Sequence, residues 1–182
     1  QIITKVGNNP QQKEVHNEIY RLIELLKFAN QAPQKSIQGL WAELLIIEQA
    51  DDIPLFIKSW HTEPTDKYDF THQTQHLEVK STRNQRRIHH FSIEQLTPID
   101  CHSIYVTSIF VEYSSNGMNI KELVDKITSK IPDQVNLQST LHLIIAKTLG
   151  KSIIEAQKLK FNYEIAVQSI VYYDAVNIPK IN

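Results

Sequence analysis

The chain has 182 residues, 41% of them hydrophobic, and a formal net charge of −1 at pH 7. These values suit one domain with a full core, and the near-neutral charge excludes a protein that binds nucleic acid over its whole surface. No apolar run reaches membrane-spanning length, no signal peptide is visible, and the lone Cys101 excludes an internal disulfide and fits the cytoplasm. Because the chain begins at Gln1, we expect residues 1–182 to be one domain of a longer chain.

Two helices are predicted in the first part of the chain. Asn9 and Pro10 open a helix that runs to about residue 29, and Ser36 caps a second helix over 36–48. Glu43 falls within the apolar stripe of the second helix, where a carboxylate either reaches the rim or pairs with a buried basic group. Glu48 is predicted to be an ordinary exposed acid.

A short helix over 54–60 and three strands, at about 67–72, 75–82 and 86–91, are predicted next. The polar segment 71–76 is long enough to reverse the chain between the first two strands. The three strands are therefore expected to form a meander.

Three charged residues lie on the predicted hairpin: Asp69, Glu78 and Lys80. Side chains alternate along a strand, so Glu78 and Lys80 share a face, and Asp69 can lie beside Glu78 on the antiparallel neighbour. Two hard oxygen ligands beside an ammonium are what metal-assisted cleavage of a phosphodiester needs. On spacing alone, however, the simpler interpretation is that these charges are the solvated face of an amphipathic hairpin.

A basic tract follows the hairpin directly. It contains Arg83, Arg86 and Arg87, and two histidines, His89 and His90, come next. Arginines beside a pair of carboxylates suit a polyanionic substrate, whose phosphates must be positioned. The alternative is a short solvated turn.

The second half of the chain continues the mixture of helices and strands. The predicted elements are a brief helix capped by Ser92, a strand over 102–113, a turn at Asn116–Gly117, a helix capped by Asn119, a helix over 133–149 ended by Gly150, and a strand-like stretch over 161–175.

Two other kinds of site are disfavoured by the sequence. His72 and His76 have the spacing of helical zinc ligands, but they fall in a polar hairpin, where the two rings do not share a helical face. A nucleophilic catalytic triad is also disfavoured, because the chain has only four glycines and contains no Gly-x-Ser-x-Gly elbow. Cys101, between Asp100 and His102, is interpreted as a packing residue.

Four segments resemble the PD-(D/E)XK nuclease superfamily, and more closely a bacterial family of uncharacterised proteins assigned to it. They are residues 39–44, 68–70, 77–82 and 89–96, and 177–181 resembles the family's later pattern. The resemblance implies an α/β (α+β) class with a restriction-endonuclease-like αβββαβ core, in which helices flank a central mixed sheet. Tyr68 is a departure, because many superfamily members have proline at that position.

The same resemblance implies an active site. Glu43, Asp69, Glu78 and Lys80 map onto the catalytic positions, and Asp69 and Glu78 with the Val79 carbonyl would hold Mg²⁺, for which Mn²⁺ would substitute. Lys80 would orient or deprotonate the attacking water, and Glu43 would hold a metal-bound water or a second metal.

Nucleic-acid contacts are expected from the segment after the hairpin. The candidates are Arg83, Arg86, Arg87, His89 and Gln95, of which Gln95 maps onto a polar helix residue that some members place near the site.

The sequence therefore predicts a Mg²⁺-dependent DNA endonuclease, a cytoplasmic hydrolase in bacterial restriction or phage defence, which would cut both strands as a homodimer. The alternative is a catalytically inactive domain of the same fold that serves as a DNA-binding or assembly module. The intact acid and lysine positions favour the enzyme.

Overall fold

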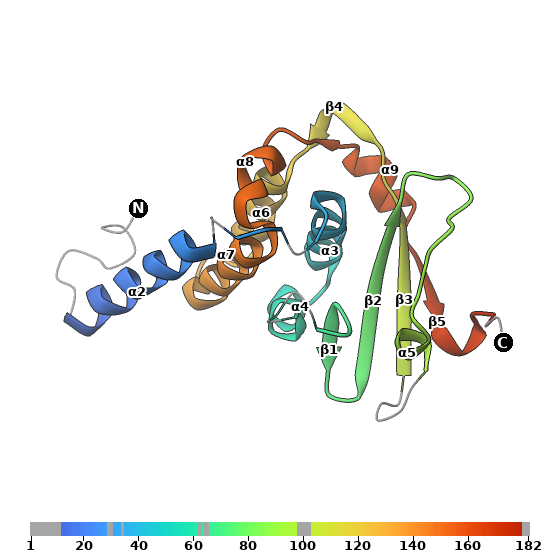
Figure 1. The fold of residues 1–182 in the computed structure, drawn as a ribbon, viewed down its shortest axis with the longest axis horizontal. Helices are drawn as coiled ribbons and strands as arrows, with labels where there is room; N and C mark the ends of the chain where they lie inside the picture. Colours follow the sequence, from blue (N-terminus) through green and yellow to red (C-terminus); the bar gives the residue numbers. More distant parts are fainter. Residues whose placement is uncertain are drawn as a thin grey trace.

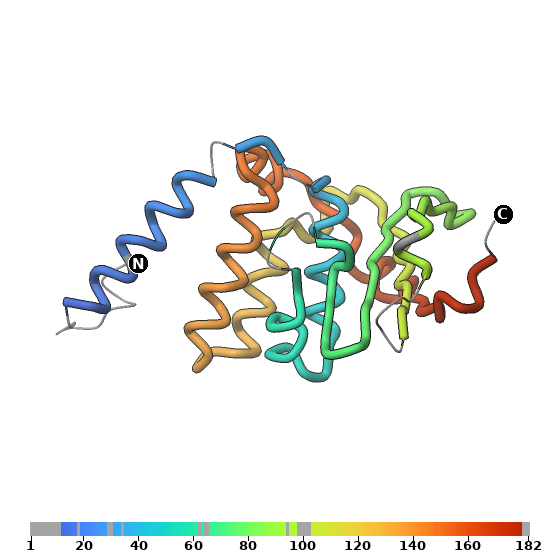
Figure 2. Tube along the Cα trace, turned by 60° about the horizontal axis from the view of Figure 1, so that its bottom comes forward, coloured from blue at the N-terminus to red at the C-terminus, as the bar shows by residue number. Residues whose placement is uncertain are grey.

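A computed structural model describes residues 12–28, 31–33, 35–61, 63, 66–97 and 103–179. In chain order its elements are α2 (Gln12–Phe28), α3 (Ile37–Gln49), α4 (Ile53–Ser59), β1 (Phe70–His72), β2 (Gln75–Thr82), α5 (Ile93–Leu96), β3 (Ser103–Phe110), β4 (Tyr113–Met118), α6 (Ile120–Ser129), α7 (Val135–Leu149), η1 (Gly150–Ser152), α8 (Ile153–Ala156), α9 (Tyr163–Gln168), β5 (Val171–Asp174) and η2 (Ala175–Asn177). Figures 1 and 2 show the sheet beside α3 and α4, with α6 and α7 on the far side of these helices and α2 at the outer end. None of the described helices is long and apolar enough to cross a membrane.

The sheet is mixed and has the order β1-β2-β3-β5. β1 and β2 form an antiparallel hairpin in which Phe70 pairs with Leu77. β2 is parallel to β3 along its whole length, and β3 is antiparallel to β5. Four strands in a mixed sheet flanked by helices confirm the predicted α/β fold class, and the arrangement is consistent with a restriction-endonuclease-like core.

The predicted strand over 86–91 is wrong, and with it the meander of three consecutive strands. Residues 83–92 contain no strand, and Arg87 adopts φ 51°, in the left-handed region, which a strand residue does not occupy. The third strand is β3. Because a parallel pair needs a long crossover connection, the segment between β2 and β3 carries α5 across one face of the sheet instead of extending it.

Two further local predictions also differ from the structure. Asn116–Gly117 lies within β4 and does not form a turn. A Cβ on Gly117 would lie 2.2 Å from the Phe161 carbonyl oxygen, so glycine is required there by a close approach between two backbones. The stretch 161–175 contains α9 as well as β5, because Asn162 caps a helix by accepting a hydrogen bond from the Ile165 N–H.

Helix α3 is the centre of the core. Every residue from Leu40 to Glu48 is buried, because the helix packs against the sheet on one side and against α6 on another. A helix enclosed on all sides buries its polar residues too. The prediction that Glu48 is exposed is therefore wrong, since its exposed fraction is 1%.

The predicted helix caps are confirmed at four positions. Ser36 accepts a hydrogen bond from the Gly39 N–H, and Ser92 and Asn119 each form a capping box. Gly150 ends α7 at φ 49°, where a side chain would be strained. The predictions for Asn9–Pro10 and Cys101 lie outside the described residues.

Candidate active site

Asp69 lies directly before β1, at the point where the pairing between β1 and β2 ends. The register that pairs Phe70 with Leu77 places Asp69 across from Glu78. The Val79 N–H lies beyond the last pair of that ladder, and it donates to Asp69 Oδ2 at 2.7 Å. The Asp69 carboxylate is therefore fixed at the end of the hairpin, and it is buried.

Glu43 reaches the same place from the middle of α3. Its Oε2 accepts hydrogen bonds from Trp60 Nε1 at 2.8 Å and from His61 Nε2 at 2.9 Å. Trp60 and His61 follow α4 and are tied to the start of β1, because Trp60 forms a β-bridge with Phe70 and the His61 N–H donates to the Asp69 carbonyl at 2.9 Å. The main chain thus brings α3 and β1 together around two acids.

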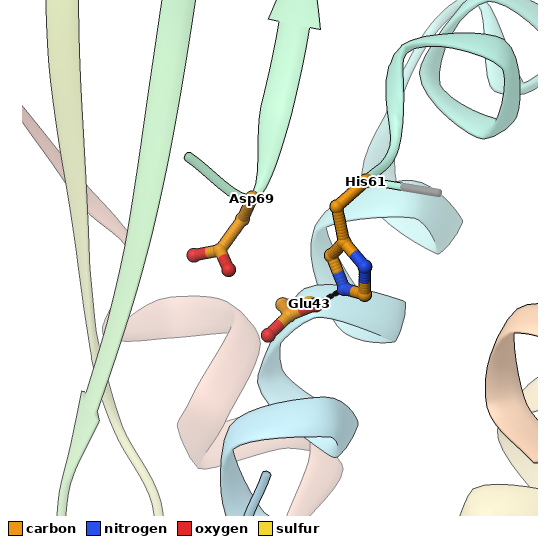
Figure 3. A group of neighbouring side chains, drawn as sticks. All are labelled: Glu43, His61 and Asp69. Atoms are coloured by element: carbon orange, nitrogen blue, oxygen red, sulfur yellow. Dashed lines mark hydrogen bonds and ion pairs between the residues drawn. The ribbon is translucent and has the colours of Figure 1, made fainter. Parts of the chain in front are cut away.

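Glu43, His61 and Asp69 form a cluster in which one potential ligand atom from each residue lies within 4.8 Å of the others (Figure 3). His61 was not predicted from the sequence. The ionised Glu43 carboxylate is a pure acceptor, so the proton of a neutral His61 is assigned to Nε2. That nitrogen then has no lone pair to offer a metal, and His61 holds Glu43 in place.

Lys35 was also missed by the sequence analysis. Its ammonium contacts both acids: it donates to Glu43 Oε1 at 2.8 Å and to Asp69 Oδ1. The sequence indicated only that Glu43, as an acid in an apolar stripe, could pair with a buried basic group. Lys35 stands just before the cap residue Ser36, and the helical pattern gave no reason to choose it.

Glu78 and Lys80 lie on the face of β2 that α5 covers. Glu78 Oε1 accepts from Lys80 Nζ at 2.7 Å and from Gln95 Nε2 at 2.8 Å. The Lys80 ammonium also lies 5.2 Å from the centre of the Phe91 ring. The structure therefore brings Gln95 to the carboxylate of Glu78.

The charges around Asp69 determine its protonation. Burial, the Glu43 carboxylate and the Glu78 carboxylate together raise the pKa of Asp69 to about 7. Burial by itself would raise the pKa of Glu43, but the His61 hydrogen bond and the charge of Lys35 outweigh it, so this pKa is lowered. Burial would lower the pKa of Lys35, yet Glu43 and Asp69 raise it. Lys35 thus pairs with Glu43 and Asp69, and Lys80 pairs with Glu78, so three acids share two lysines.

The five predicted nucleic-acid residues differ in their exposure and in their contacts. Arg87 donates to the Ser108 carbonyl at 2.9 Å and to the Ser169 carbonyl at 2.5 Å, and His89 Nε2 lies 2.7 Å from Ser108 Oγ. Arg87 therefore links the crossover segment to the sheet. Arg83 and Arg86 are exposed, although the Arg83 guanidinium lies 4.9 Å from the centre of the Tyr113 ring.

Comparison with known proteins supports the resemblance seen in the sequence. Residues 1–182 match the family described as "Putative PD-(D/E)XK family member, (DUF4420)". No curated protein and no solved structure matches the chain. Since the match covers the whole chain, the chain belongs to this family.

Proposed function

We propose that this chain is a DNA endonuclease domain that depends on a divalent cation. The observation that carries the proposal is the buried Asp69 carboxylate at the end of the β1–β2 hairpin, which clusters with Glu43 and lies across from Glu78 in the strand register, while Lys80 pairs with Glu78. Glu43 from α3 and Glu78 from β2 both raise the pKa of Asp69, which supports a shared site for the three acids.

The donor set fits a hard cation such as Mg²⁺. Carboxylate oxygens are its preferred protein ligands, and Glu43 and Asp69 already bind one cationic group, the ammonium of Lys35. Asp69 and Glu78 would hold the ion together with the Val79 carbonyl, which lies on the same side of β2 as the Val79 N–H that Asp69 accepts. Mn²⁺ would substitute for Mg²⁺, since it takes the same ligands.

A divalent cation at such a site polarises a phosphoryl oxygen and offsets the charge that develops on it. Lys80 adds a second positive charge, which Glu78 and Gln95 hold in position. Its ammonium would orient the attacking water and stabilise the transition state. Glu43, fixed by Trp60 and His61, would bind a water of the same ion or a second ion.

DNA would approach over the exposed arginines of the crossover segment. Arg83 and Arg86 are free of the sheet and would contact phosphates, whereas Arg87 is engaged with Ser108 and Ser169. Replacement of Arg86 by alanine should reduce the slope of log binding constant against log salt by about 0.9, the value for one lost phosphate contact. An unchanged slope would return Arg86 to the role of a solvated turn residue. A role in restriction or phage defence, with a homodimer cutting both strands, is proposed from the family resemblance.

The test is the cleavage of supercoiled DNA in Mg²⁺ by the wild type and by Lys80→Ala. The substitution leaves Asp69 and Glu78 in place, so the ion and DNA should still bind, but cleavage should fall by ~10²–10³, the usual cost of removing one preorganised group. Lys147→Ala is the matched control: Lys147 lies on α7 and pairs with the exposed Glu63, so its replacement should leave the rate unchanged. A Lys80→Ala variant that cuts at the normal rate would remove Lys80 from the site.

A second candidate function is a DNA-binding or assembly module without catalysis. The observation that favours it is the internal pairing of the site, in which Lys35 and Lys80 already engage all three acids. The module without catalysis is favoured if the wild type cleaves no DNA or RNA in Mg²⁺ or Mn²⁺ and binds nucleic acid as well as Lys80→Ala does.

A further inference from the structure

The groups that surround Glu43 and Asp69 differ in their access to solvent. Trp60, His61 and the Val79 N–H are buried, and each donates one hydrogen bond. Lys35 is the exception, because 21% of its side chain is exposed, against 3% for Glu43 and 8% for Asp69. Among these donors, Lys35 is the one that can leave for water without disturbing the core.

The Lys35 ammonium occupies the place that a cation bound between the two acids would take. It contacts one oxygen of each acid, Oε1 of Glu43 and Oδ1 of Asp69, and the second oxygen of each acid is occupied by buried donors. The oxygens left for an incoming ion on these two residues are therefore those that Lys35 already holds. An ion and the ammonium cannot occupy the same place.

We infer that Lys35 is a built-in counter-cation of the catalytic centre, which a divalent ion must displace in order to bind between Glu43 and Asp69. This inference rests on the proposed function, in which Asp69 is a ligand of the ion and Glu43 binds a water of that ion or a second ion. In the absence of the ion, Lys35 keeps the two carboxylates from repelling each other. When the ion enters, the Lys35 side chain moves outward on the solvent side, while Trp60 and His61 keep Glu43 in place.

Displacement lowers the apparent affinity for the ion. The binding-competent form is the one in which the ammonium has left, so the measured dissociation constant equals the intrinsic one divided by the fraction of molecules in that form. Removal of the ammonium should therefore strengthen binding, whereas removal of a distant lysine should not. A lysine that served only to stabilise the fold would give no such gain.

The first experiment measures Mn²⁺ binding by calorimetry for the wild type, Lys35→Met, Lys35→Arg and the control Lys147→Met. Lys35→Met keeps the apolar stem and removes the charge, and it should bind Mn²⁺ at least about tenfold more tightly. Lys35→Arg and Lys147→Met should bind as the wild type does. Equal or weaker binding by Lys35→Met would overturn the inference, and so would an equal gain in Lys147→Met.

The outcome separates this inference from the proposed function. If wild type and Lys35→Met bind Mn²⁺ equally, the cation centre stands and the displacement of Lys35 is wrong. If neither protein binds Mn²⁺, the cation centre of the proposed function is wrong, and the displacement fails with it.

A second experiment uses the unaltered protein and does not depend on the folding of a variant. An amine-reactive reagent is applied with EDTA or with saturating Mn²⁺, and the modification of each lysine is measured by mass spectrometry. Labelling of Lys35 should rise several-fold with Mn²⁺, because its ammonium leaves the two acids, while labelling of Lys147 should stay constant. Labelling of Lys35 that does not change at saturating Mn²⁺ would overturn the inference.

Discussion

Helix α3 carries two buried glutamates whose surroundings differ in the balance of charge. Glu48 accepts hydrogen bonds from Lys130 Nζ at 2.8 Å and from the Tyr163 hydroxyl at 2.6 Å, and Lys126 lies 3.1 Å away. Burial would raise its pKa, but these partners outweigh burial and lower the pKa of Glu48 to about 2. Glu43, by contrast, shares the single ammonium of Lys35 with Asp69.

Burial alone therefore does not mark a functional acid. At Glu48 two lysines serve one carboxylate, so the group is neutralised and joins α3 to α6 and α9. At the candidate site, acids outnumber the lysines, and the pKa of Asp69 rises to about 7. The first arrangement is complete without a ligand, while the second is suited to receive a cation.

Catalysis should distinguish Asp69→Asn from Glu48→Gln most strongly. Asp69→Asn removes a carboxylate that would hold the ion, so cleavage should fall by at least ~10²–10³. Glu48→Gln should cut at the rate of the wild type under conditions in which it is folded. Plasmid cleavage in Mg²⁺ measures both, and a loss of activity in Glu48→Gln alone would reverse the assignment of the two acids.

The second effect is the stabilisation by metal. At a Mn²⁺ concentration of about 100 times Kd, binding to the folded state alone adds about 2.7 kcal/mol to the free energy of unfolding. Thermal unfolding with EDTA and with Mn²⁺ should show this gain for the wild type and for Glu48→Gln. Asp69→Asn should show none, and an undiminished gain in that variant would place the ion elsewhere.

The third effect concerns the stability of the metal-free protein. Glu48→Gln exchanges charge-assisted hydrogen bonds for weaker ones and should lower the free energy of unfolding by about 1–3 kcal/mol. Asp69→Asn should leave it unchanged or raise it at pH 8, because it removes a buried charge that competes with Glu43 for one lysine. Urea unfolding in EDTA tests the contrast, and a larger loss in Asp69→Asn than in Glu48→Gln would contradict it.

The smallest effect is a difference in pH dependence, at most about 1.4 kcal/mol per pH unit for each acid. The folded-state pKa of Asp69, about 7, lies above its ordinary value of 3.8, so between these pH values the folded protein binds one more proton than the unfolded chain does. The free energy of unfolding therefore falls as the pH rises from about 4 to 7. Glu48 is the reverse: its pKa of about 2 lies below 4.5, so its contribution is present above pH 4.5 and is lost as the pH falls towards 2. Unfolding in EDTA across pH should show the first slope disappear in Asp69→Asn and the second in Glu48→Gln.

The parts of the site that could be predicted from the sequence depend on local patterns. The alternation along 75–82 gave the bounds of β2 and the shared face of Glu78 and Lys80, and the capping residue Ser36 gave the start of α3. The polar segment before residue 77 correctly indicated the reversal that places Asp69 across from Glu78. In each of these cases the partners are close together in the chain.

The parts that could not be predicted depend on contacts between distant segments. Residues 86–91 are predicted as a third strand of a meander, yet β2 pairs in parallel with β3, and the crossover occupies that segment. Glu48 is buried because Lys126, Lys130 and Tyr163 come from later elements. Lys35 and His61 carry no pattern of their own, and they reach the site because the chain turns before α3 and after α4.

The two acids of α3 also close loops of very different length. Glu43 bonds to Lys35 and His61, at separations of 8 and 18 residues, while Glu48 bonds to Lys130 and Tyr163, at separations of 82 and 115. Because short loops cost less entropy to close, we expect the Glu43 contacts to form early in folding and the Glu48 contacts after the transition state. In stopped-flow kinetics, Glu48→Gln should therefore speed unfolding and leave the refolding rate nearly unchanged. The candidate active site would then be assembled before the C-terminal half of the chain locks the helix that carries it.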